Sequence, residues 1–106
     1  MQIRFVYMTT ASAEEAQAIG RELVTARIAA CVNILPQMNS VYLWEGKLQQ
    51  DAETVLIAKT TAERVPELIA RVKSLHGYTC PCIVSLAIES GYPPFLEWVA
   101  DSVTPV

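Results

Sequence analysis

The chain has 106 residues, which suits one domain, and its formal net charge of −3 without any block of Lys or Arg argues against a nucleic-acid surface. No apolar run is as long as a transmembrane helix, and the start MQIRFVYMTT lacks the layout of a signal peptide. Three cysteines form no even-numbered disulfide framework, which fits a reducing compartment. We therefore predict a cytoplasmic protein with no membrane and no nucleic-acid partner.

The apolar content predicts self-association. Hydrophobic residues make up 52% of the chain, and a domain of this size has a high ratio of surface to volume. One copy alone leaves part of that apolar surface in water, so composition favours an oligomer.

The amino-terminal part predicts a strand followed by a helix. Residues 3–10 (IRFVYMTT) are rich in β-branched and aromatic side chains, which is typical of a short buried strand. Ser12 and Glu15 have the spacing of a capping box, so we expect a helix to begin there. Its apolar stripe is Ala16, Ile19, Leu23 and Ala26, and Gly20 beside the stripe permits close packing.

The middle of the chain predicts two long strands joined by a turn. Residues 30–44 follow a strand pattern in which Pro36 indicates a bulge or kink, or a division into two short strands. The sequence WEGK marks a tight turn at Gly46. In the return strand, residues 55–58 are expected to be buried on both faces.

A second helix follows the return strand. Thr60 and Glu63 have capping-box spacing, whereas Pro66 indicates either a kink or a later start. Glycine just past the last periodic residue is a common helix stop, so we expect the helix to end at His76–Gly77. The apolar stripe of this helix is Val65, Leu68, Ile69, Val72 and Leu75.

The last part of the chain predicts a fourth buried strand at residues 82–90 (CIVSLAIES) and a short closing helix within residues 91–102. The order βαββαβ plus a helix predicts an α+β, ferredoxin-like domain over residues 1–106. Its sheet has four antiparallel strands, with helices packed on one face.

The segment HGYTCPC, residues 76–82, holds the only histidine and two of the cysteines. Pro81 favours an extended backbone at Cys80, and in a strand Cys80 and Cys82 point to the same face. With His76 they could hold one soft metal ion. The alternative is structural, with buried cysteines as small apolar side chains and a histidine favoured by the helix dipole.

The sequence shows no catalytic group. Asp51 and Glu53 are interpreted as solvated charges at the end of a strand, and no glycine-rich phosphate loop is present. The strands lack the aromatic and basic pattern that RNA-binding sheets of this plan use. We therefore predict a protein that is not an enzyme and has no organic cofactor.

Two large aromatic residues, Tyr42 and Trp44, lie near the tip of the predicted hairpin. They have little of their own domain to pack against. They belong either to a subunit interface, where such residues are enriched, or to an aromatic pair across the hairpin.

In order along the chain, the sequences AACVNILP, SVYLWEGK, KTT and HGYTCP, with FLEWV near the end, resemble the CutA divalent-ion tolerance proteins. The resemblance covers nearly the whole chain. It implies a cytoplasmic homotrimer of ferredoxin-like subunits, related in architecture to the PII signalling proteins, in which the long hairpin strands pair between subunits.

The resemblance also implies a role in tolerance of copper and other divalent metals. In some members it implies a copper site of a cysteine ending the first strand and a histidine pair ending the second helix. Here Met8 and Leu75 occupy two of those positions, and only His76 matches. Gly77 replaces the usual proline, and Cys82 stands where an acid is common.

Three functions are expected from these residues. The first is a metal-tolerance trimer without catalysis in which His76, Cys80 and Cys82 hold copper or another soft metal. The second is a PII-like sensor with a small molecule in a cleft between subunits, lined by Lys59, Tyr78 and Trp44, with Tyr42 nearby. The third is a structural trimer that presents a surface to a partner protein.

Overall fold

The computed structural model describes residues 2–104. Its elements are β1 (Ile3–Thr10), α1 (Ala13–Thr25), β2 (Cys31–Trp44), β3 (Lys47–Thr61), a short 3₁₀ helix η1 (Ala62–Arg64), α2 (Val65–Leu75), β4 (Ile83–Ala87) and α3 (Pro93–Val103). The four strands form one antiparallel sheet in the order β2-β3-β1-β4. This is the predicted ferredoxin-like plan with one added helix.

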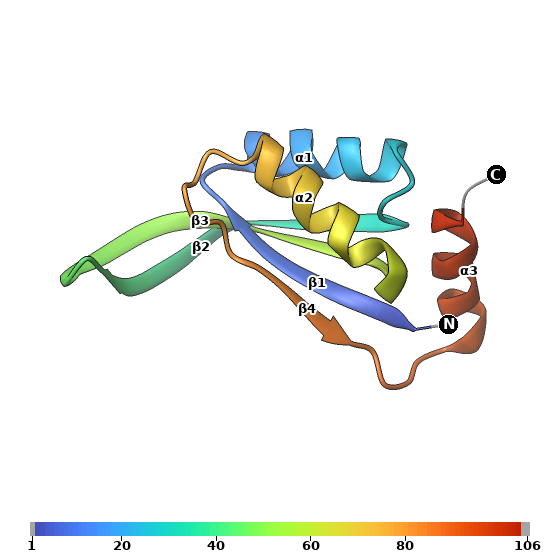
Figure 1. Cartoon of the computed structure of the whole chain (residues 1–106). Helices are drawn as coiled ribbons and strands as arrows, with labels where there is room; N and C mark the ends of the chain where they lie inside the picture. The colour runs from blue at the N-terminus through green and yellow to red at the C-terminus, as the bar shows by residue number, and fades with distance from the viewer. Residues whose placement is uncertain (1, 105–106) are drawn as a thin grey trace.

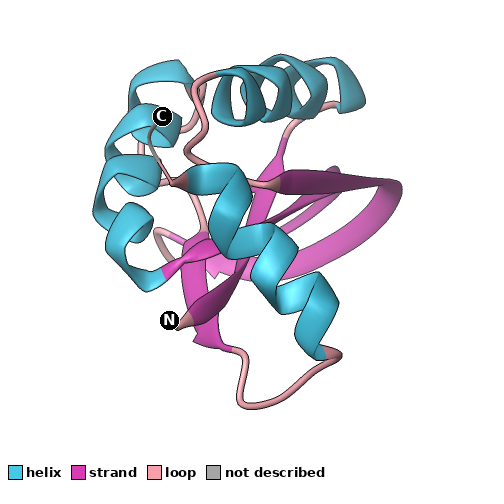
Figure 2. Cartoon of the chain, turned by 90° about the vertical axis from the view of Figure 1, so that its right-hand side faces the viewer, coloured by secondary structure: helices cyan, strands magenta, loops and turns pink. Residues whose placement is uncertain are grey.

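The core lies between the sheet and two helices. Helices α1 and α2 cover one face of the sheet, and α3 lies at the end from which the hairpin points away (Figure 1). Figure 2, in which the C-terminus marks α3, shows this helix crossing in front of the strands. The main core comprises Val6, Met8, Ala16, Ile19, Leu23, Ile28, Ala29, Leu56, Ala58, Leu68 and Val72.

Helix α1 begins as the sequence indicates. The Ser12 hydroxyl accepts a hydrogen bond from the Glu15 N–H at 3.1 Å. The Glu15 carboxylate does not return to the Ser12 N–H as a capping box requires, but accepts from the Ala11 N–H at 3.0 Å. A Cβ on Gly20 would lie 2.8 Å from Val32 Cγ2, so this glycine allows α1 to pack closely on β2.

The hairpin of β2 and β3 is long, and it extends beyond the rest of the molecule (Figure 1). Its register shifts between Leu35 and Met38, so the interruption predicted at Pro36 is a bulge. Glu45 and Gly46 both have positive φ, 53° and 78°, as a tight hairpin turn requires.

Helix α2 starts later than the expected cap. Thr60 still belongs to β3, and its hydroxyl donates to the Ile28 carbonyl at 2.6 Å, so it cannot cap a helix. The chain first forms η1, and α2 begins at Val65 with Pro66 in its first turn. The later start is therefore confirmed, and the capping box at Thr60 is wrong. The helix ends at Leu75, with His76 in an extended conformation.

Strand β4 was expected to be buried, and this is wrong. It pairs only with β1, and Val84 and Leu86 are 49% and 53% exposed. These two residues pair with Tyr7 and Phe5, on the face opposite the helices. An apolar run that is typical of a buried strand here forms an open sheet face at an edge. No helix in residues 2–104 is long and apolar enough to cross a membrane.

Candidate functional site

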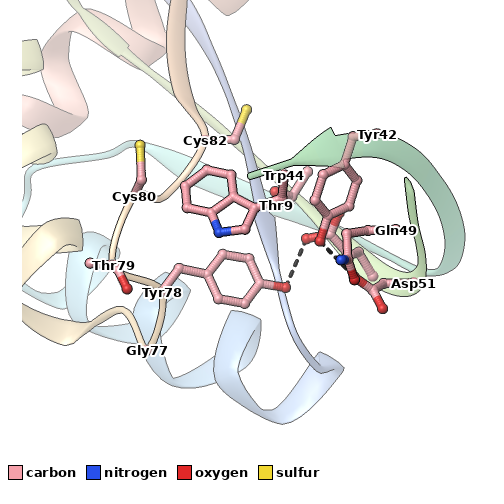
Figure 3. A pocket seen from close by; sticks show the side chains of 11 residues that line it. Thr9, Tyr42, Trp44, Gln49, Asp51, Gly77, Tyr78, Thr79, Cys80 and Cys82 are labelled. Carbon is pink, nitrogen blue, oxygen red and sulfur yellow. Dashed lines mark hydrogen bonds between the residues drawn. The ribbon is translucent and has the colours of Figure 1, made fainter. Parts of the chain in front are cut away.

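A cavity of about 570 Å³ lies between the outer half of the hairpin, towards its turn, and the loop that joins α2 to β4 (Figure 3). Its lining comes from β1, the two hairpin strands and the loop. The residues are Thr9, Tyr42, Trp44, Gln49, Asp51, Glu53, Gly77, Tyr78, Thr79, Cys80 and Cys82.

Two tyrosine–carboxylate pairs lie in this cavity. The Tyr78 hydroxyl donates to Glu53 Oε2 at 2.8 Å, and the Tyr42 hydroxyl donates to Asp51 Oδ2 at 2.6 Å. Burial, followed by the hydrogen bond to Glu53, raises the pKa of Tyr78 well above its usual range. The hydrogen bond to Asp51 is the main cause of the raised pKa of Tyr42. Both phenols therefore stay protonated and act as donors at neutral pH.

His76 is buried at the end of α2 and uses both ring nitrogens. Nε2 lies 2.7 Å from the Thr9 carbonyl oxygen, and Nδ1 accepts from the Tyr78 N–H at 3.0 Å. Because a carbonyl only accepts, the proton must be on Nε2, which assigns the neutral Nε2–H tautomer. The histidine thus fastens the loop to β1, and neither nitrogen has a lone pair left for a metal ion.

The same loop is also fixed to α1. Glu15 Oε2 accepts a hydrogen bond from the Gly77 N–H at 2.9 Å. The rings of His76 and Tyr78 lie with their centroids 4.6 Å apart. The segment HGY is therefore held by β1 and α1 together, and it sets the position of Tyr78 in the cavity.

Cys80 and Cys82 are both exposed free thiols. Figure 3 shows both sulfur atoms directed away from the Tyr78 ring. Although Cys82 is exposed as a residue, partial desolvation of its sulfur is the main cause of a raised pKa of Cys82. The charge of Glu53 adds to the shift, and a hydrogen bond with Thr9 opposes it. Residues 2–104 contain no group of three or more His, Cys, Asp or Glu placed to hold one metal ion. The structure thus brings the two cysteines to one cavity without His76.

Of the residues predicted for a cleft, Tyr42, Trp44 and Tyr78 line this cavity, and Lys59 does not. Lys59 Nζ donates to Asn33 Oδ1 at 2.7 Å and lies 5.9 Å from the centroid of the Phe95 ring. Lys59 therefore belongs to a different part of the sheet, next to α3.

Sequence reasoning missed several residues of the cavity. Glu53 was expected to be solvated, but it is only 9% exposed and bound by Tyr78. Glu53 lies two residues before Val55 and therefore on the same face of the strand. Because Val55 was expected to be buried, this position could have indicated that Glu53 is buried too. Asp51 is exposed, as expected. Thr9, Gln49 and Thr79 also line the cavity, and no local pattern marks them.

The copper site implied by the resemblance does not fit the donors present. Met8 is fully buried in the main core, Leu75 has no donor atom, and His76 has both nitrogens engaged. A metal ion at these positions would have to break a core contact of Met8 and one of the two hydrogen bonds of His76.

Comparison with known proteins shows which family the sequence resembles. Residues 4–102 match the model of the "CutA1 divalent ion tolerance protein" family. The chain is 42% identical over 99 residues to the divalent-cation tolerance protein CutA of Archaeoglobus fulgidus, covering 93% of this chain and 96% of that one. It is 44% identical over 97 residues to the Thermus thermophilus CutA, covering 92% and 94%.

Solved structures agree with this relationship. The Thermus thermophilus Cut A1 structure superposes with a TM-score of 0.94 at 42% identity, covering 96% of this chain and 99% of that one. The structure of CutA1 from Oryza sativa gives a TM-score of 0.95 at 37% identity, covering 100% and 97%. The chain belongs to the CutA1 divalent ion tolerance family.

Proposed function

We propose that this chain acts as a non-enzymatic divalent-cation tolerance protein that assembles as a homotrimer and binds copper or another soft metal. The observation that carries the tolerance role is the family match over residues 4–102. The two relatives named above are themselves called divalent-cation tolerance proteins.

Exposed apolar surface supports the assembly. In the hairpin, Val41, Leu43, Trp44 and Leu48 are 61%, 71%, 50% and 70% exposed. A long edge strand with such residues is prone to pair with another chain, so soluble proteins normally cover it. Pairing of the hairpin with a second copy would cover both its apolar side chains and its unpaired backbone groups. The number of three subunits comes from the family resemblance.

The absence of catalysis is proposed from the chemistry of the cavity. A general base or nucleophile needs a free lone pair at neutral pH. His76 has none, and the raised pKa of Cys82 keeps its thiol protonated. Glu53 is held by a tyrosine hydroxyl. These groups suit binding better than proton transfer.

A reducing compartment is part of the proposal, because Cys31, Cys80 and Cys82 are all free thiols. The Archaeoglobus fulgidus structure carries the description "periplasmic", so location is worth a direct test. Fractionation of cells that express the tagged full-length protein should place it with cytoplasmic markers.

Two measurements test the function. Native mass spectrometry of the reduced protein should show a trimer. Expression in cells that lack their own copy should restore growth under copper challenge, with empty vector as control. A monomer at micromolar concentration would contradict the assembly, and unchanged sensitivity of the cells would contradict the tolerance role.

A further inference from the structure

We propose that the cavity lined by Tyr42, Trp44 and Tyr78 binds a small protonated aliphatic amine, with the carboxylate of Glu53 as its counter-charge. This inference goes beyond the proposed tolerance role, because the ligand is an organic cation and no thiol takes part in holding it. The cavity volume of about 570 Å³ lies within the range of small-molecule sites, roughly 300–1,000 Å³.

The charged side chains that line the cavity are all negative. Asp51 and Glu53 are carboxylates, and none of the described lining residues is Lys, Arg or His. Neither carboxylate forms an ion pair within residues 2–104. Glu53 is only 9% exposed, and a carboxylate that is nearly buried without a cation is costly. The cavity therefore suits a cation and rejects an anion.

The carboxylates still have room for N–H donors. Tyr78 donates to Oε2 of Glu53, and within residues 2–104 Oε1 accepts no hydrogen bond. Tyr42 likewise donates to Oδ2 of Asp51 and leaves Oδ1 free of described donors. An ionised carboxylate has about four acceptor positions, so both groups can accept further bonds. A protonated amine supplies such N–H donors.

Three aromatic side chains suit the same ligand. A cation is attracted to the face of an aromatic ring, most strongly to that of tryptophan, and the alkyl part of an amine packs on such rings. Figure 3 shows the Trp44 indole and the Tyr78 ring at one side of the cavity, with the Tyr78 and Tyr42 hydroxyl groups directed toward the same region.

A hard metal ion fits this cavity less well than an amine. Mg²⁺ and Ca²⁺ take about six or more ligands, mostly oxygen. In residues 2–104 no three His, Cys, Asp or Glu side chains are placed to hold one ion. Aromatic walls offer a hydrated metal ion no ligands, whereas they contact an amine directly.

Assembly through the hairpin leaves the cavity face available. Tyr42 pairs with Gln49 across the hairpin, and residues two apart on a strand share a face, so Tyr42, Trp44 and Gln49 project to the same side. The three most exposed apolar residues of the hairpin, Val41, Leu43 and Leu48, project to the opposite side. A second copy that covers those residues therefore does not fill the cavity.

The probe is 1,4-diaminobutane, whose two ammonium groups match the two carboxylates. Glu53 and Asp51 are two residues apart on β3, roughly 6.6 Å between Cα atoms. The control is 1,4-butanediol, which has the same chain length and no charge. Isothermal titration of the full-length reduced protein at low salt should show one diamine per subunit and no binding of the diol. No binding of the diamine, or equal binding of both compounds, would overturn the proposal.

Variants test the two kinds of contact separately. Glu53→Gln keeps the shape of the side chain and should weaken diamine binding by about tenfold, because a charge-assisted bond becomes a neutral one. Trp44→Leu should weaken it by about two- to fivefold through loss of the ring face. The matched control Glu97→Gln removes a carboxylate from α3, at the other end of the molecule, and should leave the affinity unchanged. Equal affinities of Glu53→Gln and Glu97→Gln would refute the role of Glu53.

Nuclear magnetic resonance of the wild-type protein gives a readout that needs no variant. The chain has two tryptophans, so Trp44 and Trp98 give two indole N–H signals. Trp98 lies on α3 and serves as an internal reference. The diamine should shift the Trp44 signal in a saturable way and leave that of Trp98 in place. Equal shifts of both signals, or a shift of Trp98 alone, would overturn the site.

Discussion

Tyr78 is the residue that connects most parts of the candidate site. Its N–H donates to His76, which in turn bonds to the Thr9 carbonyl of β1, and its hydroxyl donates to Glu53 of β3. Three segments far apart in the chain are thereby joined through one side chain and its neighbour. Removing the hydroxyl alone should therefore affect stability without changing the shape of the site.

Tyr78→Phe should lower the free energy of unfolding by about 1–2 kcal/mol, because Glu53 is nearly buried and loses the one side-chain donor that it has within residues 2–104. Tyr42→Phe is the matched control: it removes the same kind of bond, to Asp51, at an exposed position and should have little effect. Urea unfolding of both variants, followed by circular dichroism, measures the difference. Equal losses would contradict the account.

The hydrogen bond between Tyr78 and Glu53 also predicts that the folded state loses stability at alkaline pH. The pKa of Tyr78 is raised above its ordinary value of 10.0 in the folded chain. Above about pH 10 the unfolded chain gives up this proton while the folded chain retains it. The stabilisation is therefore complete below that pH and is lost as pH rises. Between neutral pH and pH 11, the melting temperature should fall more steeply with pH for wild type than for Tyr78→Phe. An equal fall in the two proteins would contradict this prediction.

Gly20 offers a packing prediction. Gly20→Ala should destabilise the protein by about 1–3 kcal/mol, despite the better helix propensity of alanine, because the new methyl meets Val32 Cγ2. The double variant G20A/V32A removes the clash. It should be more stable than the sum of the two single losses predicts. Additive losses would show that the crowding at Val32 is not the cause.

At the scale of elements, the hairpin turn depends on backbone conformation alone. A Cβ on Gly46 would meet nothing within 4 Å, so Gly46→Ala tests its positive φ and should cost about 1 kcal/mol. Glu45→Asn should stabilise, since asparagine tolerates positive φ better. Thermal melts of the two variants should move in opposite directions, and a shift of both in the same direction would refute the turn assignment.

The elements were largely predictable, because apolar periodicity and turn residues are local signals. The bulge at Pro36, the turn at Gly46 and the end of α2 at Leu75 all follow from short stretches of sequence. Burial was less predictable. The apolar sequence of β4 does not indicate whether a helix, a second sheet or another chain covers the strand. In this structure its outer face is exposed.

The candidate site was predictable only in part, for a related reason. The tyrosines, Trp44 and the cysteines could be named from residue type and position. The engagement of His76 could not, because its partner Thr9 is 67 residues away in the sequence. The burial of Glu53 likewise depends on Tyr78, 25 residues further along. Contacts of this range have no signature in a single sequence.

At the scale of the whole molecule, the stability of the folded state should depend on assembly. If three copies cover the hairpin, dilution below the range where the trimer dissociates should lower the melting temperature. Leu43 and Leu48 pair across the hairpin and are both about 70% exposed. L43K/L48K should give a monomer with a lower, concentration-independent melting temperature. A wild-type melting temperature that stays constant down to the monomer would contradict this.

The position of β1 in the sheet has a consequence for synthesis of the chain. Strand β1 is synthesised before the other strands of the sheet, and its register partners come much later: Ile3 pairs with Thr61 and Arg4 with Ala87. At translation rates of about 5–20 residues per second, the first strand waits several seconds for its neighbours. During that time Val6 and Met8, which later lie in the core, have no sheet to join. Nascent chains that end before β4 should therefore be the ones that chaperones retain.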